Sequence, residues 1–329
     1  MKLLNNGYEV HGIDNNARAF FFGTEASTNS RKNLVFAEKE KYTELNIDIT
    51  NRSAINDLIS QLKPFAIIHT AAQPSHDKAA SIPFLDFETN AVGTLNLIES
   101  LRIANLDGIF IHMSTNKVYG DSPNLFPITE FDKRFDFSGD NYRLGIDEAQ
   151  TIDGSMHSLF GVSKLSADIL VQEYGRYFGM KTCVLRGGCL TGPNHKGVEL
   201  HGFLSWLVKC NLSSSNYKIF GHKGKQVRDN LHSEDVANFI NLFIESPRPA
   251  AVYNIGGGFR NSISVLEAID AVEEISGIKM KSSYISEARK GDHIVYYSNL
   301  SKMRKDYPEW KIQWSLENII ESLVKNLDE

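Results

Sequence analysis

The chain has 329 residues, of which 42% are hydrophobic and 23% charged, and its formal net charge is −5. This length fits one large or two closely packed domains, because single cores rarely grow beyond about 300 residues. An acidic balance argues against a protein that binds nucleic acid through a basic surface. No apolar run reaches the roughly 20 residues that a membrane helix needs, and no signal-peptide pattern opens the chain. We therefore expect a cytoplasmic protein that binds neither nucleic acid nor membrane.

The first half of the chain alternates short apolar runs with longer amphipathic segments. This alternation is typical of βαβ units and predicts a doubly wound parallel sheet of the Rossmann type. The predicted strands are residues 9–14, 42–48, 66–72 and 108–115. The predicted helices are residues 52–62, 84–105 and 158–178, with a loop-rich stretch from 121 to 156.

After Gly179 the pattern continues with shorter elements. It predicts strands at 182–186 and 252–255, and helices at 202–210, after Asp229 and at 265–275. We predict a cofactor domain over residues 1–185 and a smaller C-terminal α/β substrate domain over 186–329, with 225–256 returning to the first domain.

Asp14 ends the first predicted strand, where a dinucleotide-binding fold places a carboxylate on the adenine ribose. A carboxylate there repels a 2′-phosphate, so the cofactor expected is NAD. If Asp14 is considered without its context, the alternative is that it is only a turn or capping residue. The spacing of later strand ends supports the cofactor site, since Asp48 ends the second strand. The other cofactor candidates at these strand ends are Asn15, Ile49, Ala71, Ala72 and Gln73.

The glycine-rich turn that normally binds the cofactor diphosphate is missing before Asp14. A dinucleotide fold would place a strand and a G-x-x-G-x-x-G turn there. Residues 1–7 instead have the pattern of a last helical turn closed by Gly7. We expect a longer natural chain, whose upstream coding sequence supplies about thirty residues with an apolar strand and a glycine turn. Without that strand, two strands of the sheet lack their shared neighbour.

A family resemblance becomes specific at residues 114–121, which read STNKVYGD. This string resembles the end of the fifth strand in extended short-chain dehydrogenases/reductases of the NAD-dependent epimerase/dehydratase family, and most of all the CDP-paratose 2-epimerases. The resemblance implies that Thr115 hydrogen-bonds the reacting sugar oxygen, that Ser114 lies beside the cofactor and that Asn116 contacts the sugar. If Thr115 is considered alone, the alternative is that its hydroxyl only hydrogen-bonds neighbouring backbone groups at the end of the strand.

The family's second catalytic motif, Y-x-x-x-K, is altered here. Residues 157–164 read HSLFGVSK, so Phe160 stands in the tyrosine position and Lys164 in the lysine position. Residues four apart share a helix face, which lets the lysine lower the tyrosine pKa while the phenol transfers a proton. Phenylalanine carries no such proton. Three alternatives stay open: His157, His76 or Lys164 substitutes for the phenol, activity is weak, or catalysis is lost.

The resemblance also implies a substrate side. Ser75 and His76, together with Gln73, would line the sugar pocket, and Asn90 would back the cofactor. Arg228 in a VRD segment would bind the diphosphate, because a guanidinium makes paired charge-assisted bonds to phosphate. The remaining substrate candidates are Arg289, as a second diphosphate contact, and Cys189, which replaces the usual amide or hydroxyl of its loop.

Taken together, these motifs imply an NAD-dependent epimerase of a nucleotide-diphosphate sugar that acts through a transient ketone. A dehydratase or reductase is one alternative, disfavoured because Asn116 and Lys117 rather than an acidic residue follow Thr115. A nucleotide-sugar-binding protein without catalysis is the other, motivated by Phe160. Relatives form a four-helix dimer interface, so the helices 84–105 and 158–178 imply a homodimer. The histidines are not spaced as a metal site, and no metal is expected.

Overall fold

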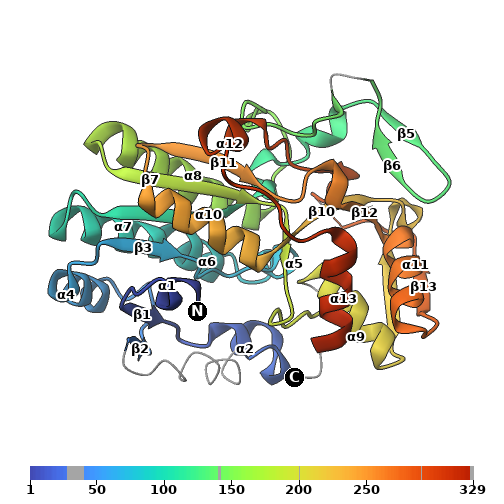
Figure 1. The fold of residues 1–329 in the computed structure, drawn as a ribbon, viewed down its shortest axis with the longest axis horizontal. Helices are drawn as coiled ribbons and strands as arrows, with labels where there is room; N and C mark the ends of the chain where they lie inside the picture. The colour runs from blue at the N-terminus through green and yellow to red at the C-terminus, as the bar shows by residue number, and fades with distance from the viewer. Residues whose placement is uncertain (28–40, 140–141, 200, 290, 327–329) are drawn as a thin grey trace.

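The protein is described from a computed structural model over residues 1–27, 41–139, 142–199, 201–289 and 291–326. Its main sheet has four parallel strands in the order β11-β7-β4-β3 (Figure 1). The strands are β3 (Ala66–His69), β4 (Ile109–Thr115), β7 (Lys181–Gly187) and β11 (Ala251–Ile255). Parallel strands joined by helical crossovers confirm the predicted Rossmann-type fold.

Helices cover both faces of this sheet, as is usual for parallel sheets, whose strands carry apolar side chains on both faces. Ile109 and Ile111 of β4 pack into one core cluster, whereas Phe110 between them packs into another. The first cluster includes α10 (Ser233–Glu245) and α12 (Ser301–Asp306). The second includes α4 (Arg52–Leu62), α7 (Gly93–Ala104) and α8 (Leu159–Phe178). Successive side chains of β4 therefore point to opposite faces of the sheet, and each face packs against its own layer of helices.

Two further strands, β1 (Val10–Ile13) and β2 (Tyr42–Leu45), form a parallel sheet of their own. Within the described ranges, no strand pairs with both β1 and β3. The short α1 (Lys2–Asn5) lies against α10, where Asn6 Nδ2 donates to Asn241 Oδ1 at 2.5 Å. Gly7 follows with a positive φ of 89°, as expected for a helix end.

Most predicted elements are present, with shifted boundaries. The helix predicted at 84–105 consists of α6 (Pro83–Phe87), a π-helical turn η3 (Glu88–Val92) and α7. The helix α8 begins where predicted, because Ser158 Oγ accepts a hydrogen bond from Gly161 N at 3.0 Å and caps it. The sequence reasoning missed several short elements: α2 (Ala17–Phe22), α5 (His76–Ala79), β5 (Ile128–Glu130) and β6 (Phe135–Phe137).

The C-terminal lobe is built around β10 (Val227–His232). Its partners are β8 (Cys189–Thr191), β12 (Ser262–Ser264) and β14 (Val295–Tyr296). A second pair consists of β9 (Asn216–Phe220) and β13 (Lys281–Ile285), and the covering helices are α9 (Phe203–Leu212), α11 (Val265–Ser276) and α13 (Leu316–Asn326). Because β8 follows β7 directly, β10 lies beside the carboxyl end of the main sheet. The domain boundary at 185/186 stays a prediction, and residues 225–256 contribute β10 to this lobe and β11 to the main sheet.

Candidate active site

A cavity of about 1030 Å³ lies at the carboxyl ends of β3 and β4, between the two lobes. Ligands of open α/β sheets bind at this edge. The cavity brings together most of the candidates from the sequence: Asp14, Asn15, Asp48, Ile49, Ala71, Ala72, His76, Ser114, Thr115, Asn116, Phe160, Lys164, Cys189, Arg228 and Arg289. The candidates that do not line it are Gln73, Ser75 and Asn90.

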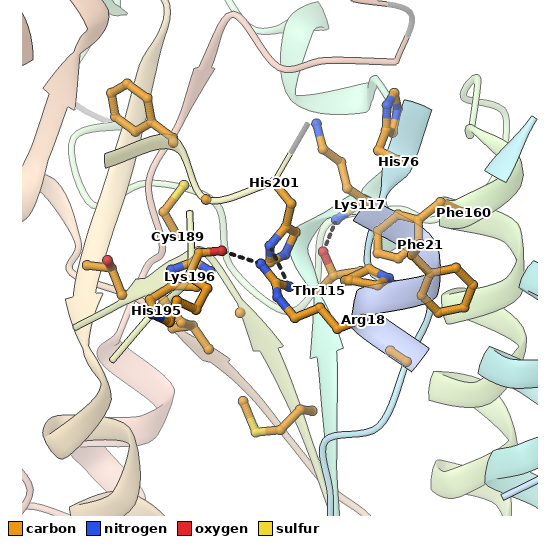
Figure 2. A pocket seen from close by; sticks show the side chains of 18 of the residues that line it. Arg18, Phe21, His76, Thr115, Lys117, Phe160, Cys189, His195, Lys196 and His201 are labelled. Atoms are coloured by element: carbon orange, nitrogen blue, oxygen red, sulfur yellow. Dashed lines mark hydrogen bonds between the residues drawn. The ribbon is translucent and has the colours of Figure 1, made fainter. Parts of the chain in front are cut away.

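Thr115 is the last residue of β4 and faces the cavity (Figure 2). Its Oγ1 accepts a hydrogen bond from Lys117 N at 3.2 Å and so caps the short 3-10 turn η4 (Asn116–Tyr119). A strand followed immediately by a capped turn fixes the hydroxyl at the sheet edge. A hydroxyl can both donate and accept, so Thr115 keeps the capacity to bind a sugar oxygen.

Lys164 and Phe160 lie one helical turn apart on α8, and both line the cavity. Lys164 is only 4% exposed, and its Nζ donates to Met113 O at 2.7 Å. Burial lowers the pKa of Lys164 to about 8, against the opposing charges of Asp168 and Asp86. The ring of Phe160 occupies the first turn without a titratable group. The lysine half of the motif is therefore in place and the phenol half is absent.

Replacing Lys164 by methionine tests this buried amine through stability. The folded pKa of about 8 lies below the ordinary 10.5, so between these pH values the unfolded chain binds more protons at this site than the folded chain. The parent's free energy of unfolding should therefore rise relative to that of Lys164→Met over this range, by on the order of 3 kcal/mol. Urea denaturation of both proteins from pH 7 to 10.5 measures it. If the difference in unfolding free energy between the two proteins does not change with pH, Lys164 titrates as an ordinary lysine. The control is Lys325→Met, which replaces an exposed lysine.

The histidines proposed as substitutes for the phenol lie in different places. His157 lines a separate cavity, and its ring nitrogens face Val118 O at 2.9 Å and Ser155 O at 3.1 Å. His76 lines the main cavity as well as the second one, and its buried Nε2 has no hydrogen-bond partner. Of the two histidines, only His76 is placed to exchange a proton with a ligand of the main cavity.

Behind Thr115, a buried ion pair joins β4, β7 and α8. Arg186 donates from Nε and Nη2 to the two carboxylate oxygens of Asp168, each at 3.0 Å. Ser114 Oγ donates to the same carboxylate at 2.7 Å, and Gln172 Nε2 donates to it at 2.6 Å. Asp168 is fully buried and lies one turn beyond Lys164. The sequence reasoning missed it, although a carboxylate on the same face of an apolar helix was a visible signal.

The candidates outside the cavity wall form a second buried network. Gln73 N donates to Asn90 Oδ1 at 2.9 Å, and Gln73 Nε2 donates to Asp86 Oδ1 at 2.7 Å. Asn90 Nδ2 reaches Ser163 Oγ on α8 at 3.0 Å, and the Gln73 carbonyl accepts a bond from the same amide. Ser75 is fully buried and caps α5. This network ties the loop after β3 to α8, while direct contact of these residues with a ligand stays a prediction.

The part of the cavity wall next to Thr115 carries positive charge. Arg228 Nη2 and Lys117 Nζ both contact Asp292 Oδ1, each at 2.8 Å. Burial by itself raises the pKa of Asp292, but the two cations outweigh it and hold that pKa well below its usual range. Arg289 lies further along, with its guanidinium 4.7 Å from the centre of the Phe220 ring. Two cations share one carboxylate here, so the wall keeps a surplus positive charge. The sequence reasoning missed Lys117 and Asp292 as members of this wall.

The predicted cofactor end of the cavity carries carboxylates. Asp14 Oδ1 accepts a hydrogen bond from Asn16 N at 2.6 Å, and Asn15 Nδ2 donates to Asp48 Oδ2 at 3.0 Å. Carboxylate acceptors lie at one end of the cavity and the buried Lys164 lies at the other. These groups suit the two riboses of a dinucleotide, so the residues present fit NAD at both ends.

For metals, the described part of the chain holds no group of three or more His, Cys, Asp or Glu side chains placed as ligands. Among the described helices none is long and apolar enough to cross a membrane, and a cytoplasmic location stays a prediction.

A parallel sheet with Thr115 at the end of β4 and a buried lysine on the following long helix defines a Rossmann-type protein of the extended short-chain dehydrogenase/reductase class. The model of the "NAD dependent epimerase/dehydratase family" matches residues 1–256. The chain belongs to this NAD-dependent family.

Relatives within the family differ in their reactions. The chain is 32% identical to a CDP-paratose 2-epimerase of Salmonella typhi, over 82% of this chain and 78% of that one. It is 28% identical to dTDP-glucose 4,6-dehydratase 1 of Escherichia coli, over 88% and 79% of the two chains. Its fold is similar to that of a tyrosine-to-phenylalanine variant of a Bacillus cereus UDP-glucuronic acid 4-epimerase, with a TM-score of 0.79, 24% identity and coverage of 99% and 92%.

Proposed function

We propose that the protein catalyses the NAD-dependent epimerisation of a nucleotide-diphosphate sugar, with CDP-paratose or a related CDP-hexose as substrate and C2 as the reacting carbon. The observation that carries this proposal is the convergence of Thr115, Lys164 and Arg228 on one cavity. The relative that is a CDP-paratose 2-epimerase supports the choice of substrate.

Each of these side chains has a task in the reaction. NAD supplies the hydride acceptor and later the hydride donor. The Thr115 hydroxyl hydrogen-bonds the sugar oxygen whose carbon becomes a transient ketone. The buried Lys164 ammonium holds the nicotinamide ribose, and Arg228 binds the diphosphate with its planar fork. With NAD bound, loss of a hydride from C2 and of the hydroxyl proton would give the ketone, and return of both to the opposite face would invert the carbon without net oxidation. His76, whose buried Nε2 has no hydrogen-bond partner, would hold the proton in place of the missing phenol.

Two other functions compete with this one. Sugar dehydration is disfavoured because the residues after Thr115 are Asn116 and Lys117, and Lys117 is held by Asp292 at 2.8 Å. Binding of a nucleotide sugar without turnover is favoured by Phe160, since losing a general acid/base typically lowers a rate by about 10²–10⁴-fold. We expect slow epimerisation rather than none, because Thr115 and Lys164 remain in the cavity.

The test is inversion at C2 of the sugar, with the C2 deuterium retained because the hydride that leaves C2 is the one that returns. CDP-paratose deuterated at C2 is incubated with the protein and NAD, and the 2-epimer is followed by NMR beside calorimetric titration of the same ligands. Appearance of the 2-epimer supports the proposal. Binding without any change at C2 favours the non-catalytic function, and loss of water from the sugar favours the dehydratase. The variant Thr115→Val, which removes only the hydroxyl, should abolish formation of the 2-epimer while it preserves binding.

We also propose a homodimer. The helices α6 and α8 expose large apolar side chains: Phe84 is 83% exposed, Leu159 48%, Val162 43% and Tyr177 82%. The two helices contact each other, and large exposed apolar patches typically mark an interface. The double variant Phe84→Glu/Val162→Glu should elute as a monomer in size-exclusion chromatography with light scattering, whereas Phe65→Glu, at another exposed phenylalanine, should not change the parent's dimer mass. A parent that is monomeric at micromolar concentration would refute the dimer.

A further inference from the structure

Arg18 lies inside the cavity but belongs to none of the motifs that point to the proposed function. It stands in the first turn of the short helix α2, four residues after Asp14. Figure 2 shows its side chain between Thr115 on one side and the segment of Lys196 and His201 on the other. Arg18 Nη2 donates to Lys196 O at 2.5 Å, and Nη1 lies 3.3 Å from His201 Nδ1. The guanidinium therefore bridges the cofactor side and the substrate side of the cavity.

The charge of Arg18 has no acidic partner among the described residues. Its other contact is the ring of Phe22, whose centre lies 5.2 Å away. The other two arginines that line the cavity differ, because Arg228 is paired with Asp292 at 2.8 Å and Arg289 Nε lies 3.7 Å from Asp77 Oδ2. Burial lowers the pKa of Arg18, but a guanidinium stays protonated at neutral pH. A half-buried cation that has no counter-ion among the described residues is costly, and an anionic ligand in the cavity would offset that cost.

The donor geometry of Arg18 indicates which anion fits. A guanidinium carries five N–H donors in one plane, and the contacts with Lys196 and His201 use at most two of them. The remaining donors can make the paired bonds that phosphate oxygens accept. Nearby His195 and His201 are neutral, since burial lowers the pKa of His195 to about 4 and that of His201 well below its usual range. Both imidazole rings are therefore uncharged, and the cationic side chains at this place are those of Arg18 and Lys196.

We infer that Arg18 binds a diphosphate group, either that of the dinucleotide cofactor or that of the nucleotide sugar. The inference rests on the proposed function, because that function brings both diphosphates into this cavity. Asp14, four residues earlier, places Arg18 beside the predicted adenosine end, and the contact with Lys196 places it beside the segment that follows Cys189. The cation is therefore within the part of the cavity that either ligand must cross.

Isothermal titration of the full chain tests the site without turnover. The probes are inorganic pyrophosphate, ADP and CDP, and the variants are Arg18→Gln, which removes the charge, and Arg18→Lys, which keeps it but loses the fork. Arg176→Gln is the matched control, because Arg176 is exposed on α8 and paired with Glu173. Arg18→Gln should weaken binding by about 10- to 100-fold, since a hydrogen bond to a charged group is lost. Arg18→Lys should lie between the parent and Arg18→Gln.

The pattern of losses identifies the ligand. Weaker binding of ADP alone assigns Arg18 to the cofactor diphosphate, and weaker binding of CDP alone assigns it to the substrate diphosphate. Equal affinities of parent, Arg18→Gln and Arg176→Gln for every probe would overturn the inference, as would a parent that binds none of them. Thermal melting without ligand shows whether Arg18→Gln is folded, and if it is not, the comparison of parent with Arg18→Lys decides. Loss of ADP or CDP binding without any epimerisation would leave the site standing and refute the proposed function.

Discussion

Replacing Phe160 by tyrosine is expected to raise the epimerisation rate by about 100-fold or more, within the range that a general acid/base typically contributes. Phe160 is 7% exposed, lines the cavity and lies one helical turn before Lys164. A phenol there would share a helix face with the buried ammonium, which lowers a phenol pKa by stabilising the phenolate. The rate is measured as formation of the 2-epimer with saturating NAD and nucleotide sugar.

Two comparisons make this experiment decisive. Phe65→Tyr adds a hydroxyl at an exposed phenylalanine and should leave the rate unchanged. The double variant Phe160→Tyr/Lys164→Met should lose the gain, because the new phenol then lacks its cationic neighbour. If Phe160→Tyr is no faster than the parent, another group already transfers the proton, and His76 with its unpartnered Nε2 is the first to replace.

The largest effect on stability is expected from Asp168→Ala, which should lower the free energy of unfolding by about 3–5 kcal/mol. The substitution leaves the buried Arg186 guanidinium without its carboxylate and removes the acceptor of Ser114 Oγ and Gln172 Nε2. Breaking one partner of a buried pair is more costly than replacing both, since the remaining charge stays desolvated. Urea denaturation followed by circular dichroism measures the loss.

The same helix offers a matched control. Glu173 pairs with Arg176 at 2.6 Å on the surface of α8, with side chains 53% and 55% exposed. Glu173→Gln should change stability by less than about 1 kcal/mol, because exposed ion pairs contribute little. The double variant Asp168→Leu/Arg186→Met, which removes both charges, should recover part of the loss. A change below about 1 kcal/mol for Asp168→Ala would show that this pair does not hold β4, β7 and α8 together.

The main sheet was predictable because its signals are local. A run such as 109–113, which is apolar except for His112, has to be covered on both faces, and Ser158 ahead of an apolar helix marks where α8 begins. The π-helical turn at Glu88–Val92 was not predictable, since it keeps the apolar spacing almost unchanged. The hairpin of β5 and β6 was missed because three-residue strands are too short to show an alternation.

The candidate residues that line the cavity as predicted are those that a single local sequence motif carries. Thr115, Lys164 and Arg228 belong to this kind, and all three line the cavity. Residues that act across elements were missed, because their partners are far apart in the sequence: Asp292 contacts Lys117 over a separation of 175 residues, and Arg18 contacts Lys196 over 178. Such pairs become visible only when the fold brings the segments together.

The most direct test of the account is a crystal structure of the full chain with NAD and CDP-paratose. We expect the sugar C2 oxygen within about 2.6–3.2 Å of Thr115 Oγ1, Lys164 on the nicotinamide ribose and the substrate diphosphate on Arg228. A nucleotide sugar bound with its hexose turned away from Thr115 and Lys164, or bound outside this cavity, would contradict it.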